Sequence, residues 1–214
     1  MLKISKFVFN MFGVNTYVVW DEATREAVVV DPGMIEEREC KALDNFITDN
    51  ELTVTGIVNT HLHLDHSFGV GHMKTLYDVP LKCGLADAPL GNAIPQQCAS
   101  FGLPHISGPV SIDAGLSQGD KIRLGDNELT VLAVPGHSPG SIALYSPKQK
   151  FVIVGDVLFR QGIGRTDLPG GDFNTLISSI RQRLMTLPDD VVVYSGHGGP
   201  TTIGQERRQN PYIR

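Results

Sequence analysis

Short apolar runs separated by turn residues dominate the pattern of hydrophobic and polar positions along the chain. Most of these runs are too short for helices and are rich in β-branched and aromatic side chains, which is typical of buried strands. The sequence predicts strands at residues 7–9, 16–20, 27–30, 54–59, 79–82, 121–124, 128–134, 142–145, 151–154 and 191–194.

Helical spacing of apolar residues appears in three longer segments, and the pattern predicts helices over residues 36–50, 67–77 and 174–187. Residues 84–119 are rich in Pro and Gly, and we expect them to form a long irregular surface loop over the functional site. Groups of strands with helices between them favour an α/β sandwich. The length of 214 residues favours one domain spanning residues 1–214.

Composition narrows the class of protein. The net charge is −5, from 18 basic and 23 acidic residues, which argues against a nucleic-acid partner bound through its phosphates. No run approaches the ~18 apolar residues of a membrane span, and the N-terminal segment lacks the features of a signal peptide. We therefore expect a cytoplasmic protein with no membrane partner, in which Cys40, Cys83 and Cys98 stay reduced.

The segment THLHLDH, residues 60–66, follows directly on a predicted strand. It places four potential metal ligands close together: His61, His63, Asp65 and His66. Unpaired imidazoles and carboxylates are costly to bury, so a purely structural role for this cluster is disfavoured. The segment is therefore a candidate metal site.

Three other predicted strands end in a turn that presents a nitrogen or oxygen ligand. His137, Asp156 and His197 each follow such a strand, and each stands directly after a glycine. Sheet proteins build metal and catalytic centres from groups gathered at the ends of neighbouring strands. Imidazole together with carboxylate suits Zn, Fe or Mn, whereas Ca²⁺ and Mg²⁺ prefer oxygen ligands alone.

The order of these seven positions resembles the metallo-β-lactamase superfamily over residues 28–204. The stretches GDVLF at 155–159 and GIGRTD at 162–167 are similar to the hydroxyacylglutathione hydrolase (glyoxalase II) group and to the related persulfide dioxygenases. The resemblance implies a four-layer αββα sandwich with two divalent transition-metal ions at one edge. Zinc is the expected metal, with iron or manganese as alternatives.

The resemblance also implies a role for each candidate ligand. It assigns one ion to His61, His63 and His137. It assigns the second ion to Asp65, His66 and His197. Asp156 would bridge the two ions, and Asp65 and Asp156 are the candidate catalytic carboxylates. Asp31 would support the ligands without binding metal itself.

Other polar residues have less specific interpretations. Arg160 and Arg165 are the candidate substrate-binding residues, and each could bind an anionic substrate or pair with Asp167 or Asp172 at the surface. We expect His72 to be solvated. His105 is expected to be an ordinary loop histidine, with a role in a lid as the alternative.

The chemistry of these groups favours a hydrolase of small-molecule thioesters. A metal-bound water with a pKa of about 7 would provide hydroxide at neutral pH, and the metal charge would stabilise an oxyanion. The motifs hold no obvious general acid for a poor leaving group. A thiol, with an ordinary pKa of about 8.5, leaves as the thiolate without one. We therefore predict a metal-dependent thioesterase of the glyoxalase II type.

Two alternatives stay open. One is an iron-dependent persulfide dioxygenase, in which the resemblance implies a single iron held by His61, His137 and Asp156. The other is a metal-binding sensor that catalyses nothing. A β-lactamase is disfavoured because no export signal is present, and a nuclease is disfavoured by the acidic balance.

The C-terminal segment indicates whether the thiol part of the substrate is glutathione. In glyoxalase II enzymes a C-terminal helical region with basic and aromatic residues holds glutathione, but here only 17 residues follow His197. They include Arg207, Arg208, Tyr212 and Arg214. We therefore expect the glutathione pocket to be mostly absent or differently built.

Overall fold

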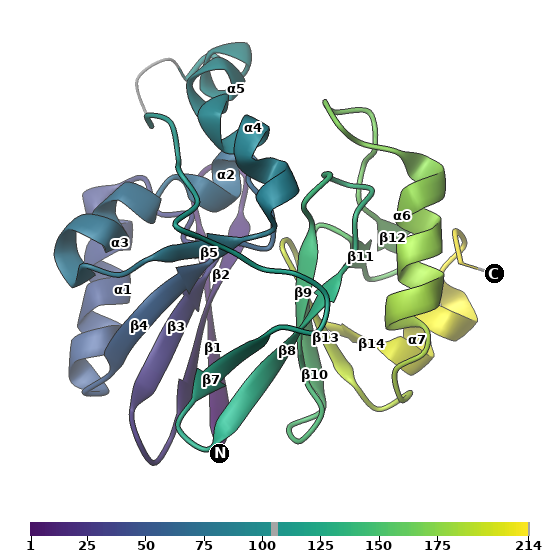
Figure 1. Cartoon of the computed structure of the whole chain (residues 1–214), viewed down its shortest axis with the longest axis horizontal. Helices are drawn as coiled ribbons and strands as arrows, with labels where there is room; N and C mark the ends of the chain where they lie inside the picture. The colour runs from purple at the N-terminus through teal and green to yellow at the C-terminus, as the bar shows by residue number, and fades with distance from the viewer. Residues whose placement is uncertain (104–106, 214) are drawn as a thin grey trace.

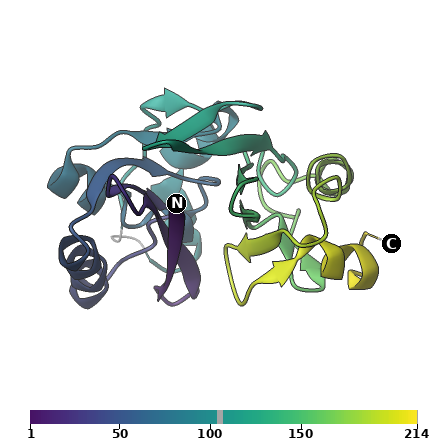
Figure 2. The same ribbon diagram turned by 90° about the horizontal axis from the view of Figure 1, so that it is seen from below.

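The computed structural model describes residues 1–103 and 107–213, so His105 and Arg214 lie outside the described residues. In the described part, two six-stranded sheets pack face to face, with helices on both outer sides (Figure 1). Seen from below, the N-terminal strands and the C-terminal segment lie on opposite sides of the molecule (Figure 2).

The first sheet has the strand order β1-β2-β3-β4-β5-β6. Its strands are β1 (Leu2–Phe9), β2 (Val14–Asp21), β3 (Glu26–Val30), β4 (Thr53–Val58), β5 (Leu81–Cys83) and β6 (Ala114–Gly115). The strands from β1 to β3 pair antiparallel, whereas those from β3 to β6 run parallel. Because β3 and β4 are parallel neighbours, Asp31 and residues 59–66 emerge at the same edge of the sheet.

The second sheet has the order β14-β13-β10-β9-β8-β7. Its strands are β7 (Lys121–Leu124), β8 (Asn127–Ala133), β9 (Ile142–Ser146), β10 (Phe151–Gly155), β13 (Val192–Ser195) and β14 (Thr201–Thr202). Only the pair β10 and β13 is parallel among these described strands. A small hairpin of β11 (Leu158–Phe159) and β12 (Gly162–Ile163) follows β10.

Helices cover the outer faces of both sheets. The first sheet is covered by α1 (Glu37–Asp49) and α3 (Val70–Tyr77). The second is covered by α6 (Phe173–Ser179), its π-helical continuation η2 (Ile180–Leu184), and α7 (Ile203–Gln209) (Figure 1). The short α2 (Leu64–Ser67) carries two of the predicted ligands. No helix in the described residues combines the length and the apolar character needed to span a bilayer.

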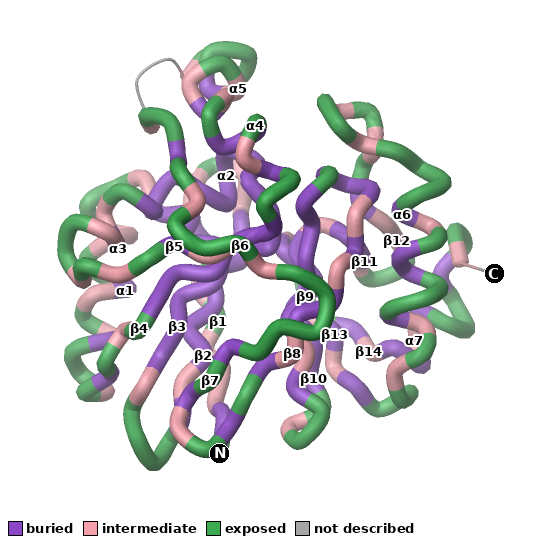
Figure 3. The backbone as a smooth tube through the Cα atoms, in the orientation of Figure 1, coloured by how far each residue is buried: buried purple, intermediate pink, exposed green. Residues whose placement is uncertain are grey.

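Alternating side chains on the strands fill the spaces between these layers. On β2, Val19 belongs to the buried cluster between the sheets, which includes Leu144, while its neighbour Val18 belongs to the cluster under the helices, which includes Leu43. Val154 shares a third buried cluster with Leu176 of α6. Burying each such side chain contributes about 1.5–3 kcal/mol to the free energy of unfolding, relative to leaving it exposed to water. The strands are therefore the most buried part of the chain (Figure 3), and the predicted α/β sandwich is confirmed in its four-layer αββα form.

The prediction of an irregular loop at residues 84–119 was wrong in part. This segment contains a 3₁₀ turn, η1 (Leu85–Asp87), two helices, α4 (Ala88–Asn92) and α5 (Ile94–Ser100), and the strand β6. Pro89 and Pro95 stand in the first turn of their helices, where proline begins a helix instead of breaking it. The segment does lie over the candidate site, as predicted.

Other elements also differ from the predicted pattern. The first strand begins at Leu2 instead of residue 7, because Lys3, Ser5 and Lys6 interrupt its apolar run. The predicted helix over residues 67–77 is divided into α2 and α3. The C-terminal α7 was missed, since Ile203 is its only large apolar residue.

Candidate metal centre

Four strand ends bring the predicted ligands to one edge of the sandwich. β4 of the first sheet leads into residues 60–66, while β8, β10 and β13 of the second sheet lead to His137, Asp156 and His197. The approach is close enough to require glycine at one turn, because a Cβ on Gly196 would lie 2.1 Å from Oδ1 of Asp156. The edge between the sheets therefore collects the whole predicted ligand set.

Three histidines from both sheets converge on one point. Nδ1 of His63 lies 2.9 Å from Nε2 of His137, and Nε2 of His61 lies 3.3 Å from that same nitrogen. All three side chains are buried, and their ligand atoms lie within 4.8 Å of one another. A tetrahedral ion with bonds of ~2.0–2.1 Å holds its nitrogen ligands roughly 3.3 Å apart. The spacing therefore fits one such ion.

A second group lies beside the first. Nε2 of His197 is 3.1 Å from Oδ2 of Asp65, and Nε2 of His66 is 3.6 Å from the same oxygen. These three side chains again offer ligand atoms within 4.8 Å of one another. These two groups have the same members as the two sets that the sequence resemblance implied, while a third, overlapping group joins His61, His66 and Asp156. The division into two sites therefore stays a proposal.

Asp156 lies between the two groups. Its Oδ1 is 3.4 Å from Nε2 of His66, and its Oδ2 is 3.5 Å from Nε2 of His197 and 3.8 Å from Nε2 of His137. The carboxylate therefore faces ligands of both sets, which is the position that a bridging ligand needs. We keep the bridge itself as a proposal.

Hydrogen bonds on the far side of two rings fix the nitrogen that faces the centre. Nδ1 of His137 donates to the backbone oxygen of Arg165 at 2.8 Å, and Nδ1 of His197 donates to that of Phe12 at 3.1 Å. When these rings are neutral, the proton on Nδ1 leaves a lone pair on Nε2, directed at the other ligands.

Asp31 lies behind two further predicted ligands. Its Oδ2 accepts a hydrogen bond from Nδ1 of His66 at 3.0 Å and from the hydroxyl of Thr60 at 2.7 Å. The Thr60 oxygen in turn lies 3.1 Å from Nδ1 of His61. Asp31 is fully buried and has a left-handed backbone, φ +52°. This buried chain of bonds orients His61 and His66 together.

Charges in the cluster favour a bound cation. Burial lowers the pKa of His61 well below its ordinary value and lowers that of His63 to about 3, so both rings are neutral. Burial alone would also lower the pKa of His66, but the carboxylates of Asp65 and Asp156 raise it well above the ordinary value. Burial alone would raise the pKa of Asp156, yet His66 lowers it. Without a metal, the ionised carboxylates thus hold a proton on His66 while His61 and His63 stay neutral, so the cluster already stabilises a positive charge in a small buried space.

Unpartnered buried atoms test whether these residues fit a metal. Nε2 of His66 and Oδ1 of Asp156 are buried and have no hydrogen-bond partner among the described residues, although both face the ligand cluster. Buried polar atoms without a partner are rare and costly in native proteins. A cation between the groups would satisfy both atoms. The donor set of imidazoles and carboxylates therefore fits transition-metal ions.

Of the two predicted substrate-binding residues outside the ligand set, only one lines the cavity. Arg165 lines the cavity above the centre, but its Nε and Nη2 donate to the carboxylate of Asp167 at 2.7 and 2.6 Å, which is the ion pair considered as its alternative role. Arg160 is exposed and does not line this cavity. The expectation that His72 is solvated was wrong, because this half-buried ring lies 2.9 Å from Oδ2 of Asp44 on α1.

The sequence analysis missed Asp87, a buried carboxylate in η1. Its Oδ2 accepts hydrogen bonds from the backbone NH of Leu62 at 3.0 Å and the hydroxyl of Ser138 at 2.8 Å. Its Oδ1 accepts one from the backbone NH of Gly140 at 2.6 Å. Asp87 therefore joins the turn that carries His61 and His63 to the turn that carries His137.

Gln97 of α5 has a similar function and was also missed. Its Oε1 accepts a hydrogen bond from the backbone NH of Leu64 at 3.1 Å. Its Nε2 donates to the backbone oxygens of Leu90 at 2.9 Å and Leu62 at 3.3 Å. The helices that cover the site thus also hold the ligand segment in place. Neither residue has a sequence signal, because its partners are backbone groups elsewhere in the chain and, for Asp87, also the remote hydroxyl of Ser138.

A cavity of about 420 Å³ opens above the metal centre. Its floor contains five of the predicted ligands: His63, Asp65, His137, Asp156 and His197. Its apolar lining residues are Phe12, Leu64, Leu90, Ala93, Phe101, Leu168 and Pro169. The other lining residues are Gln96, Gln97, Ser100 and Arg165. A substrate bound here would have its reacting end at the ligand cluster.

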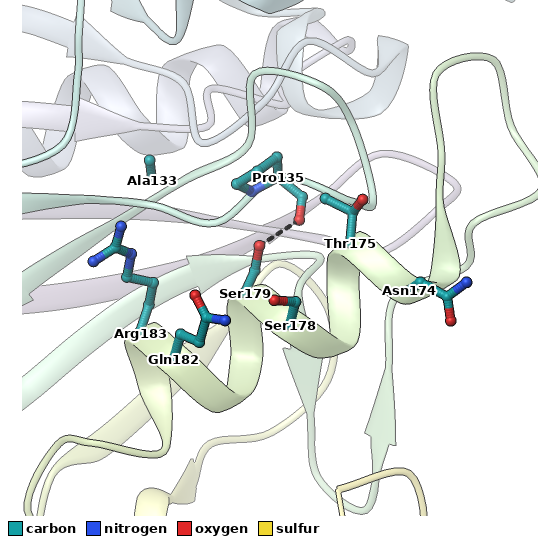
Figure 4. A pocket seen from close by; sticks show the side chains of 8 residues that line it. All are labelled: Ala133, Pro135, Asn174, Thr175, Ser178, Ser179, Gln182 and Arg183. Carbon is teal, nitrogen blue, oxygen red and sulfur yellow. Dashed lines mark hydrogen bonds between the residues drawn. The ribbon is translucent and has the colours of Figure 1, made fainter.

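A second hollow of about 490 Å³ lies between α6 and the end of β8 (Figure 4). None of the predicted site residues lines it. There the hydroxyl of Ser179 donates to the backbone oxygen of Pro135 at 2.7 Å (Figure 4), which ties α6 to the turn that presents His137. The contact beside this hollow therefore has a structural role, which is to position the turn that carries His137.

Comparisons with known proteins agree with this geometry. Residues 10–197 match the family model described as the metallo-beta-lactamase superfamily. The hydroxyacylglutathione hydrolase GloC of Haemophilus influenzae is 37% identical over 203 residues, which cover 94% of this chain and 93% of that protein.

Two solved structures are similar over nearly the whole chain. The B3 metallo-beta-lactamase BLEG-1 superposes with a TM-score of 0.89 and 33% identity, covering 99% of both chains. TTHA1623 in a di-iron-bound form superposes with a TM-score of 0.85 and 34% identity, covering 97% of this chain and 99% of that one.

Proposed function

The chain belongs to the metallo-β-lactamase superfamily, and we propose that within it the protein is a metal-dependent hydrolase of thioesters, of the glyoxalase II type. The proposal places one ion with His61, His63 and His137 and the other with Asp65, His66 and His197. Asp156, which faces histidines of both groups, would be a ligand to both ions. Zinc is the proposed metal, and the similarity to a di-iron-bound structure makes iron the first alternative.

The main support for the thioester proposal is the state of the ionisable residues that line the cavity. Every described one is either a proposed metal ligand or part of an ion pair. His63, Asp65, His137, Asp156 and His197 belong to the proposed ligand set, and Arg165 is paired with Asp167. No described lining residue is therefore free to protonate a leaving group. An amine or alkoxide needs such a proton, whereas a thiol leaves as the thiolate.

Bound metal ions would supply an acidified water and a positive charge opposite the substrate carbonyl oxygen. In the reaction, a water oxygen forms a bond to the carbonyl carbon, the carbon–sulfur bond breaks, and its electron pair leaves on sulfur. The proton released by the water goes to the solvent, and the departing thiolate takes a proton from the solvent in turn. The products are a carboxylate and a thiol.

The protein residues contribute positioning. Asp31, Asp87 and Gln97 hold the ligand segment through buried or half-buried hydrogen bonds, so the ligand cluster is formed before substrate arrives. The helices α4 and α5 cover the cavity and restrict its access to water. Both effects would favour reaction of a carbonyl held at the ligand cluster.

The direct test is thioester hydrolysis without oxygen. Protein purified without added metal is first analysed for its metal content, then stripped by chelation and reloaded with Zn, Mn or Fe. We expect anaerobic release of free thiol from S-D-lactoylglutathione or a smaller acyl thioester, and loss of that activity after chelation. Iron-dependent oxygen uptake with glutathione persulfide, without thioester hydrolysis, would instead indicate a dioxygenase. Hydrolysis of a β-lactam alone would indicate a lactamase.

A further inference from the structure

An aromatic wall faces the metal centre across the cavity. The rings of Phe12 and Phe101 meet edge to face, with centroids 5.5 Å apart and planes at 87°. Phe12 also stacks at 6.4 Å on Phe68, which is buried. Because the backbone oxygen of Phe12 accepts the hydrogen bond from His197, the position of this wall is fixed relative to the ligands. Phe101 is 48% exposed, which leaves apolar surface for a ligand to cover.

The described lining residues of the cavity offer no free positive side chain for a negatively charged substrate. Among its described lining residues, Arg165 is the only Arg or Lys, and its Nε and Nη2 are both bonded to Asp167. Two of the three C-terminal arginines considered for glutathione, Arg207 and Arg208, both pair with Asp189, and the third, Arg214, lies outside the described residues. A thiol carrier with two carboxylates, such as glutathione, would therefore find an apolar wall and no free charge partner among the described lining residues.

From these observations we infer that the preferred substrates are thioesters of an apolar, aromatic or branched acyl group with an uncharged thiol. The inference rests on the proposed thioesterase function and narrows its substrate class. The acyl group packs against the exposed side of the Phe12–Phe101 pair, and its carbonyl is directed at the ligand cluster. Phe12 and Phe101 are then the residues that determine specificity.

The first experiment varies only the acyl group. The metal-loaded protein is given acetyl and phenylacetyl thioesters of N-acetylcysteamine, a neutral thiol, and each kcat/KM is divided by the rate of alkaline hydrolysis of the same compound. A buried apolar group in a fitted pocket changes kcat/KM by about tenfold or more. We expect phenylacetyl to exceed acetyl by at least that factor. A ratio near one overturns the inference.

Variants identify the wall as the cause. Phe101→Ala is expected to lower kcat/KM for the phenylacetyl compound by about tenfold while changing that for the acetyl compound less than twofold. Phe173→Ala is the matched control, because Phe173 is 49% exposed on α6 and does not line the cavity. Equal losses with both substrates in Phe101→Ala would assign it a structural role and contradict the inference.

The thiol carrier is tested with the same acyl groups. We expect phenylacetylglutathione to be hydrolysed no faster than the N-acetylcysteamine thioester, in kcat/KM. A preference for the glutathione thioester by tenfold or more would overturn the claim of an uncharged carrier.

A binding measurement separates this inference from the proposed function. Calorimetric titration compares phenylacetate with acetate on the metal-loaded protein, and we expect phenylacetate to bind about tenfold more tightly and to lose that advantage in Phe101→Ala. If no thioester is hydrolysed but this difference is found, the proposed function fails and the apolar pocket stands. If thioesters are hydrolysed and the two acids bind equally, the function stands and the pocket inference fails.

Discussion

The Asp156 carboxylate faces histidines of both ligand groups at 3.4 to 3.8 Å, so its removal affects both groups at once. We predict that Asp156→Ala lowers the metal content of the protein toward zero, whereas His197→Ala lowers it by about one ion per chain. Elemental analysis after gel filtration measures the content, and circular dichroism checks the fold. Two retained ions in Asp156→Ala would rule out the bridging assignment.

The pair of Arg165 and Asp167 makes a second prediction at the residue scale. Asp167→Asn removes the negative partner and frees the guanidinium at the edge of the cavity. We expect KM for a glutathione thioester to fall by up to about fivefold, the size of an exposed ion pair, with KM for a neutral thioester unchanged. Arg165→Ala should leave both KM values within about twofold, because the guanidinium is already occupied. A selective rise in KM for the anionic substrate in Arg165→Ala would show that Arg165 binds it after all.

Local motifs explain why the ligands could be predicted and their supports could not. His61, His63 and His66 follow a strand within one short segment, and each remote ligand follows a strand and a glycine. Asp87 and Gln97 instead bind backbone groups that are 7 to 53 residues away in the chain. Any residue type offers a backbone NH or carbonyl, so such bonds leave no pattern in the sequence.

At the scale of elements, the segment from η1 to α5 both covers the cavity and holds the ligands. The sequence pattern predicted the location of this segment over the site but not its helices. Each of these short helices has a proline in its first turn, and in so short a segment a proline suggests a loop instead of the start of a helix. The hydrogen bonds of Gln97 are the direct link between α5 and residues 62–64. The position of the helices and the geometry of the metal centre are therefore coupled.

This coupling predicts the effect of Gln97→Ala. Loss of the three bonds leaves backbone groups near His63 without partners, which costs about 1–3 kcal/mol of unfolding free energy. Metal affinity should fall by about tenfold, the usual effect of removing a ligand's support. Gln96→Ala is the control, since Gln96 is an exposed neighbour on the same helix. Competition with a chelator measures affinity. Equal metal affinity in Gln97→Ala and Gln96→Ala would show that α5 covers the cavity without supporting the metal ligands.

At the scale of the whole molecule, the two sheets are joined through their apolar interior and through polar contacts at both ends. The strand alternation predicted the interior, because Val18 and Val19 must face opposite sides of one sheet. The polar contacts could not be predicted, since they depend on how the two sheets meet. One of them is formed by Asp21 at the end of β2, whose Oδ2 accepts a hydrogen bond from Asn127 of β8 at 2.6 Å.

Asp21 predicts how stability depends on pH. Hydrogen bonds from the backbone of Thr24 and Ala23 lower its pKa from 3.8 to about 2 despite burial, so the folded state favours the ionised form. The stabilisation, about 2 kcal/mol, is fully present above pH ~4 and is lost as the pH falls through about 2. We expect Asp21→Asn to lower the unfolding free energy of the metal-free protein by about that amount at pH 7.

The difference between Asp21→Asn and the unchanged protein should shrink as the pH is lowered below 4, be small at pH 2 and vanish below it. Urea unfolding at a series of pH values measures it in metal-free protein, which removes the contribution of metal binding. Asp126→Asn is the control, because Asp126 is an exposed carboxylate in the turn next to Asn127. A constant difference between pH 7 and pH 2 would mean that the loss comes from altered packing at the joint between the sheets and not from the charge of Asp21.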